Sequence, residues 1–109
     1  MEKQILGTST TIILKNKKVP AKIDTGADKS SINLTLAKEL GLTKDLWGIR
    51  KIKSSNGYEY RPLVKSKIKI KNRILPITFT ITKRENLRYP LLIGKDILKG
   101  NFLVDVSLK

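Results

Sequence analysis

The sequence predicts a mostly β protein, folded as a small closed β-barrel with one or two short helices. Short segments rich in β-branched residues recur along the 109 residues, and turn-forming Asn, Gly and Pro separate them. Many short strands at regular spacing are typical of β-barrels. The length corresponds to one domain over residues 1–109, because a domain usually contains about 100–200 residues.

The first expected elements are a hairpin and a polar loop. Thr10–Leu14 and Val19–Ile23 are rich in β-branched residues. The polar segment Asn16-Lys17-Lys18 between them predicts the turn of a hairpin. Residues 24–30 are polar and begin with Asp-Thr-Gly, which predicts a loop.

A short strand and a helix are expected next. Ser31–Leu34 is predicted to return to a strand, and Thr35–Leu40 is predicted to form a helix. Either Asn33 or Thr35 would cap that helix, and Gly41 follows its last residue.

The middle of the chain predicts a second hairpin and the clearest strand. Apolar and basic residues alternate over Ile49–Lys53, and Ser54-Ser55-Asn56-Gly57 predicts a turn, because Asn-Gly accepts positive φ angles. In Val64–Lys71 every second residue is a lysine, so one face of this strand is expected to be solvated and to protect a sheet edge. Trp47 is expected to pack in the core.

The last third of the chain predicts four further elements. Pro76 within Ile74–Thr82 indicates a strand at an edge or with a bulge. The remaining expected elements are a polar loop over Lys83–Pro90, a buried strand over Leu91–Ile93 ending at Gly94, a helical turn over Asp96–Lys99 closed by Gly100, and a final strand over Phe102–Val106.

The absence of cysteine and histidine removes several kinds of site. No disulfide can form, and the histidine-activated nucleophiles of serine and cysteine hydrolases are excluded. Zinc prefers sulfur and imidazole ligands, so no metal site is expected. The available acids and bases are Asp, Glu, Lys and Tyr. Serine–lysine chemistry is a minor alternative, because no serine lies on a recognisable nucleophile turn.

The formal net charge is +14, from 18 Lys and five Arg against nine acidic residues. Such a charge attracts polyanions, which could be a nucleic acid, an anionic membrane face or an acidic polypeptide. AT-rich coding, which enriches Lys, Ile and Asn, explains the same composition equally well. The shortage of Arg argues against specific recognition of a nucleic acid.

The first residues, Met1-Glu2-Lys3-Gln4, lead into only a short apolar stretch, so no signal peptide is expected. No run approaches the roughly 18 apolar residues of a membrane span. These features predict a cytoplasmic protein with no membrane partner.

The segment Pro20–Asp28, which reads PAKIDTGAD, carries the most chemical information. Asp24 directly follows an apolar strand, so its carboxylate would lie at the mouth of the core. Thr25 can hydrogen-bond within the loop, and Gly26 lets the backbone approach closely. Taken alone, Asp-Thr-Gly favours an ordinary turn over a catalytic loop.

A second segment, Leu91–Leu98, reads LLIGKDIL. In this order the two segments resemble those of the retropepsin-like aspartic proteases, in which an Asp-Thr-Gly-Ala loop precedes an apolar-apolar-Gly-Arg-Asp/Asn-apolar-Leu segment. Ile5–Gly7, Ala21–Ser31 and Arg88–Val106 extend the similarity to a bacterial and archaeal branch named as ATP-dependent zinc proteases.

The resemblance implies a barrel of the retropepsin-like, acid-protease type with a catalytic loop formed by Asp24, Thr25 and Gly26. In that family the threonine hydrogen-bonds across a dimer axis, and the glycine offers its backbone to the substrate. Ala27 and Asp28 would bind substrate at the edge of the cleft, although Asp28 could also be a solvated loop acid.

Other residues take supporting roles by the same resemblance. Ile93, Gly94, Lys95 and Asp96 would support the catalytic loop from beneath. Lys95 stands where the family has an arginine that pairs with the acid at position 28, whereas Asp96 taken alone is expected to cap its helical turn.

Asn56 and Gly57 lie where the family has a flap that closes over substrate, so they are expected to contact it. No cofactor is expected, because Gly94-Lys95-Asp96 lacks the upstream glycine of a phosphate-binding loop and the zinc in the branch name has no cysteine or histidine to bind it.

The sequence therefore predicts an aspartic peptidase subunit that hydrolyses peptide bonds with water activated between two Asp24 carboxylates. The chain has one Asp-Thr-Gly loop, so the second carboxylate would come from a homodimer. Relatives of this branch are associated with enzymes that ligate glutamate, and an acidic substrate such as oligoglutamate would suit the charge. The alternatives are a non-catalytic basic β-barrel that binds nucleic acid or another polyanion, and an inactive monomer with the protease fold.

Overall fold

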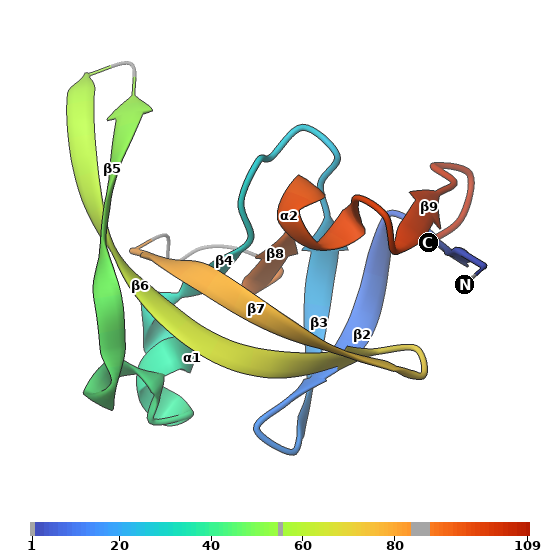
Figure 1. The fold of residues 1–109 in the computed structure, drawn as a ribbon, viewed down its shortest axis with the longest axis horizontal. Helices are drawn as coiled ribbons and strands as arrows, with labels where there is room; N and C mark the ends of the chain where they lie inside the picture. The colour runs from blue at the N-terminus through green and yellow to red at the C-terminus, as the bar shows by residue number, and fades with distance from the viewer. Residues whose placement is uncertain (1, 55, 84–87) are drawn as a thin grey trace.

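The computed structural model describes residues 2–54, 56–83 and 88–109, and within these ranges the chain is mostly β, as predicted (Figure 1). Its elements are β1 (Gln4–Leu6), β2 (Ser9–Leu14), β3 (Lys17–Ile23), β4 (Ser31–Asn33), α1 (Leu34–Glu39), the 3-10 turn η1 (Leu42–Lys44), β5 (Leu46–Ser54), β6 (Gly57–Ile70), β7 (Arg73–Thr82), β8 (Leu91–Ile93), α2 (Lys95–Leu98) and β9 (Phe102–Val104). No helix in the described ranges is long and apolar enough to cross a membrane.

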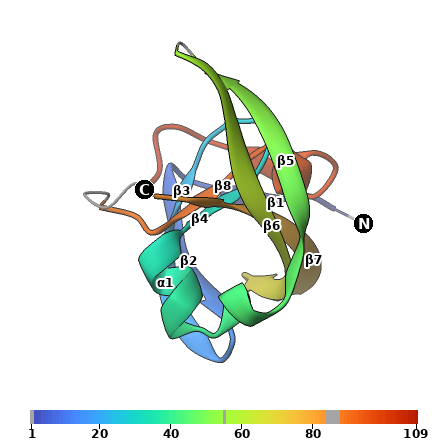
Figure 2. The ribbon, with the colours of Figure 1, turned by 90° about the vertical axis from the view of Figure 1, so that its left-hand side faces the viewer.

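The main sheet returns on itself. Its strands pair in the order β2-β3-β8-β4-β7-β6-β5, and β6 pairs again with β2, where Ile12 lies opposite Ile70. β5 pairs with β6 outside this ring, and the two strands project from the body as a long hairpin (Figures 1 and 2). β1 and β9 form a separate parallel pair near the chain ends.

Side-chain alternation along β6 separates the core from solvent. Val64, Ile68 and Ile70 are buried, whereas the intervening Lys65, Lys67 and Lys69 are exposed. The predicted solvated lysine face is therefore confirmed. Its predicted role at a sheet edge holds only for Lys65 and Lys67, which pair with β7 alone between the ends of β5 and β2, whereas Lys69 pairs with both β7 and β2.

The tight turn of the first hairpin lies one residue earlier than expected. Lys15 and Asn16 have φ angles of 51° and 65°, so β3 already begins at Lys17. Lys71, with a φ of 57°, opens the turn between β6 and β7. Pro76 lies in the part of β7 that pairs only with β6, since β4 reaches only Thr80–Thr82, which agrees with the predicted edge position.

The helix α1 is capped by Asn33, one of the two predicted candidates. The Asn33 side chain accepts hydrogen bonds from the backbone N–H groups of Thr35 and Leu36 at 2.8 and 3.3 Å. Gly41 follows with a φ of 73°, a conformation that terminates helices readily because glycine lacks a Cβ.

The expectation that Trp47 packs in the core is wrong. Its side chain is 60% exposed, and the Lys65 ammonium lies 3.2 Å from the centre of its ring. The β5–β6 pairing shifts register between Leu46 and Gly48, so Trp47 lies in a bulge. A bulge leaves its extra residue unpaired and redirects its side chain.

The helix α2 begins against the loop at 24–30. Its N-cap is Gly94, so the expectation that Asp96 caps this helix is wrong. Lys95 N donates to the Ala27 carbonyl at 2.8 Å. A Cβ on Gly94 would lie only 2.7 Å from that carbonyl oxygen and 2.9 Å from the Lys29 carbonyl oxygen, so only glycine fits here without movement of the backbone.

We predict that Gly94→Ala lowers the free energy of unfolding by about 1–3 kcal/mol, the usual cost of overpacking. Gly48→Ala is the matched control, because the nearest atom to its new Cβ would be 3.9 Å away. Urea denaturation of both variants measures the difference. Equal stabilities would contradict the close packing at Gly94.

Candidate functional site

Asp24 lies where two parallel strands end together. β3 pairs in parallel with β8, and Ile23 lies opposite Ile93 in the last register position. Asp24 N donates to the Ile93 carbonyl at 2.9 Å, so the residue after β3 stays attached to the end of β8. The chain then turns back over 24–27, with Ala27 N donating to the Asp24 carbonyl at 3.3 Å.

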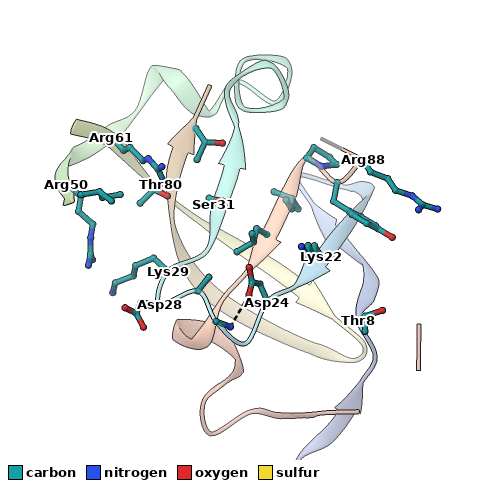
Figure 3. Close-up of a pocket in the computed structure, with 18 residues that line it drawn as sticks. Thr8, Lys22, Asp24, Asp28, Lys29, Ser31, Arg50, Arg61, Thr80 and Arg88 are labelled. Atoms are coloured by element: carbon teal, nitrogen blue, oxygen red, sulfur yellow. Dashed lines mark hydrogen bonds between the residues drawn. The ribbon is translucent and has the colours of Figure 1, made fainter. Parts of the chain in front are cut away.

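The Asp24 carboxylate is held by its own loop. Its Oδ1 atom accepts a hydrogen bond from Gly26 N at 2.9 Å (Figure 3). A Cβ on Gly26 would lie 3.3 Å from that oxygen, which is tighter than an ordinary contact, so glycine suits this position. Asp24 is half-buried, and its carboxylate remains accessible from a cleft.

The cleft beside Asp24 has a volume of about 850 Å³ and a strongly basic lining. In the described part of the chain, two acidic residues line the cleft, Asp24 and Asp28. The basic lining residues are Lys22, Lys29, Arg50, Arg61 and Arg88. Figure 3 shows Arg50 and Arg61 toward one end of the lining and Arg88 toward the other, with Asp24 between them. Sequence analysis did not identify this cluster, because its members come from distant segments.

A buried serine connects the Asp24 loop to α2. Ser30 has no exposed surface, and its Oγ donates to Asp96 Oδ1 at 2.7 Å while accepting a hydrogen bond from Gly94 N at 3.0 Å. Ser30 N also donates to Asp96 Oδ2 at 3.2 Å. Asp96 therefore supports the loop as a hydrogen-bond acceptor, and Ser30 is a site residue that sequence analysis did not single out.

The expected partner of Asp28 is in place, but the pair is exposed. Lys95 Nζ lies 3.1 Å from Asp28 Oδ1, with 53% and 82% of the two side chains exposed. Exposed ion pairs contribute about 0–1 kcal/mol because water screens them. The support beneath the loop therefore comes mainly from Ser30, Gly94 and Asp96.

The structure brings most of the expected site residues together, but not the two at the hairpin turn. Asp24, Gly26, Ala27 and Asp28 line the cleft, and Thr25 is an exposed residue of the same turn. Asn56 and Gly57 lie at the tip of the β5–β6 hairpin and are not among the described lining residues. Ser55, which belongs to the predicted turn, lies outside the described residues, as does 84–87 of the predicted polar loop.

The donor set does not fit a zinc ion. The sequence has no cysteine or histidine, and no three carboxylates gather in the described parts of the chain. Zinc sites are built largely from sulfur and imidazole, so no step of the chemistry is assigned to a metal.

Comparisons with known proteins identify the family and the fold. Residues 36–109 match a family described as "Retropepsin-like aspartic endopeptidase RimB", a segment that begins after the Asp24 loop. The match confirms the predicted resemblance to retropepsin-like proteases but not the narrower name of ATP-dependent zinc proteases. No curated protein matches the chain.

Solved structures show the same fold. Protein Lpg0085 of Legionella pneumophila, of unknown function, is 23% identical with a TM-score of 0.71, over 99% of this chain and 97% of its own. EIAV protease in complex with an inhibitor is 22% identical with a TM-score of 0.66, over 89% and 91%. A retropepsin-like aspartic protease from Rickettsia conorii is 20% identical with a TM-score of 0.68, over 84% and 70%.

We predict that Ser30→Ala lowers the free energy of unfolding by about 1–3 kcal/mol, because Gly94 N loses its acceptor inside the protein. Lys95→Gln, which removes the exposed ion pair, is expected to change it by less than about 1 kcal/mol. Chemical denaturation of both variants tests this ranking. A larger loss in Lys95→Gln than in Ser30→Ala would contradict it.

Proposed function

Because the chain belongs to the RimB-like family of retropepsin-like aspartic endopeptidases, we propose that it is an aspartic peptidase that works as a homodimer around two Asp24 carboxylates. The observation that supports this most is the Asp24 side chain, which is fixed by Gly26 N at 2.9 Å and faces a cleft large enough for a peptide. Aspartic peptidase chemistry needs two such carboxylates, and the sequence contains one Asp-Thr-Gly loop.

The two carboxylates would divide the work of an acid and a base. Like charges a few ångströms apart cannot both ionise, so one carboxyl group keeps a proton while the other is charged. The charged group takes a proton from a water molecule, which attacks the scissile carbonyl. The protonated group donates a hydrogen bond to the carbonyl oxygen. When the C–N bond of the resulting tetrahedral intermediate breaks, the first group passes the proton that it took from water to the leaving nitrogen, which restores the starting pair.

Neighbouring residues would complete the dimeric site. Thr25 is exposed in the isolated chain, which leaves its hydroxyl available to hydrogen-bond with the partner loop. Gly26 and Ala27 would present backbone groups to the peptide, and Asp28 would contact it at the edge of the cleft. A two-fold axis beside Asp24 would supply the second carboxylate and the partner loop, and two-fold dimers are the commonest oligomers.

We further propose that the substrate is acidic. Five basic side chains line the described cleft against two acids, so the field inside it is positive. Three of the five are arginines, whose planar guanidinium groups can bind carboxylates through two parallel hydrogen bonds. The sequence has only five arginines in total, so the cleft holds an unusual share of them.

We predict that Asp24→Asn abolishes peptide cleavage while leaving the fold intact, because the amide can act neither as the base nor as the acid. Cleavage of a diverse peptide library by this variant is compared with cleavage by Asp45→Asn. Asp45 is an exposed acid outside the cleft, so its variant is expected to retain full activity. Cleavage that survives in Asp24→Asn would refute the aspartic mechanism. A protein that stays monomeric at high concentration yet cleaves peptides would refute the dimer.

We predict that Arg50→Gln and Arg88→Gln raise the KM for acidic peptides by about tenfold each, as expected for a lost charge-assisted hydrogen bond. Moderate salt should weaken binding of the same peptides. Lys67→Gln, which removes an equal charge from an exposed face outside the cleft, is the control. The proposal of an acidic substrate would be contradicted if neutral peptides were cleaved as fast as acidic ones and if salt had no effect on the cleavage.

A further inference from the structure

The β5–β6 hairpin has two chemically different faces. Arg50, Ile52 and Arg61 line the cleft, so they point to one side of the hairpin. Alternate residues of a strand point to opposite sides. The register pairs Ile49 with Pro62, Lys51 with Tyr60 and Lys53 with Tyr58 on the other side. These six residues form the outer hairpin face, which is turned away from the cleft.

Two exposed tyrosines and two lysines lie side by side on the outer hairpin face. Tyr58 and Tyr60 are 61% and 65% exposed and follow each other along one strand, about 7 Å apart by strand geometry. Their direct partners on the other strand are Lys53 and Lys51, and both lysines are exposed. The Lys51 ammonium also lies 4.0 Å from the centre of the Tyr58 ring.

The two charged side chains of this face are both lysines. The acid of the hairpin, Glu59, points to the opposite side with Ile52, its cross-strand partner, and pairs with Arg61 at 3.2 Å. Within the described hairpin, the outer face therefore carries two lysines and no acid.

The exposed aromatic residues of the chain are concentrated in this hairpin. The sequence has one Trp, three Tyr and two Phe. Phe79 and Phe102 are buried in the core, whereas Trp47, Tyr58 and Tyr60 are exposed residues of β5 and β6. The low aromatic content of the whole chain therefore conceals a local cluster.

We propose that the outer hairpin face binds single-stranded nucleic acid. Two successive bases would stack on Tyr58 and Tyr60, while Lys51 and Lys53 contact the adjoining phosphates. Sheets that carry exposed aromatic residues and flanking cations bind single strands in this way, because every base has a π-face and every nucleotide has a negative charge.

The pairing of aromatic and basic residues favours a nucleic acid over an acidic polypeptide. An acidic polypeptide would need only the lysines, and it has no flat ring for each tyrosine to stack on. The proposed site also lies opposite the cleft, so nucleic acid and peptide could be bound at the same time. The peptidase would then be held close to substrates that accompany a nucleic acid.

Fluorescence anisotropy with a labelled 20-nucleotide oligouridylate, measured across a range of salt concentrations, tests this proposal on the full chain. Tyr58→Leu/Tyr60→Leu is expected to raise the Kd by at least about tenfold, since each stacked base contributes about 1–3 kcal/mol. Tyr58→Phe/Tyr60→Phe keeps both rings and is expected to bind within about threefold of the wild type.

A matched pair of lysine variants separates the site from bulk charge. Lys51→Ala/Lys53→Ala and Lys67→Ala/Lys69→Ala remove equal charge from the outer hairpin face and from the exposed β6 lysine face. The first is expected to weaken binding more strongly and to lower the magnitude of the salt slope by about 1.4, since each phosphate contact to a single strand contributes about 0.7. Equal losses in the two variants, or full affinity in the Tyr→Leu variant, would overturn the proposal.

Poly-L-glutamate as a competitor distinguishes the remaining partner. In the first measurement, poly-L-glutamate competes with the oligouridylate for the wild-type protein at equal charge concentration. In the second, the Tyr→Leu variant is tested for binding of each polymer. If poly-L-glutamate displaces the oligouridylate and the variant loses affinity for both polymers equally, the face binds acidic polypeptides and the proposal is wrong. Unchanged binding of the oligouridylate in Asp24→Asn is expected, because the proposed site shares no residue with the catalytic loop.

Discussion

The contact between the loop at 24–30 and the start of α2 is the constraint on which the site depends. Two backbone segments meet at Gly94 at a distance that no Cβ could occupy without movement. The fully buried Ser30 then satisfies Gly94 N and donates to Asp96. Since unpaired polar groups inside a protein are costly, this contact has few alternative arrangements. The loop is thereby fixed to the end of β8, and Asp24 is fixed to the loop.

The site shows how a small chain can present a carboxylate without burying it deeply. Parallel pairing of β3 with β8 brings Asp24 to the end of both strands, and one backbone N–H from Gly26 orients the carboxylate.

The large positive charge of the chain is distributed over three separate regions of the surface. Cationic residues line the cleft, the exposed side of β6 carries a row of lysines, and the outer hairpin face combines lysines with tyrosines. A bulk charge of +14 does not distinguish these regions.

Features that depend on local chemistry were predictable from the sequence. The alternation along β6, the cap at Asn33 and the buried strand before Gly94 follow from side-chain periodicity and from turn and capping residues. The exposure of Trp47 and the buried role of Ser30 were not predictable, because they depend on a register shift and on contacts between distant segments. The proximity of the Asp24 loop to Gly94 was anticipated only through the family resemblance, and the basic lining of the cleft had no local signal.

The proposed mechanism requires that each active site use Asp24 from two chains, and subunit mixing measures this directly. Wild-type protein and Asp24→Asn are mixed in equal amounts, allowed to exchange subunits, and assayed for peptide cleavage. If two carboxylates are needed, only pairs of two wild-type chains are active. The activity then falls to about a quarter of that of the same total concentration of wild-type chains. Activity of about half, as expected if each chain works alone, would contradict the shared site.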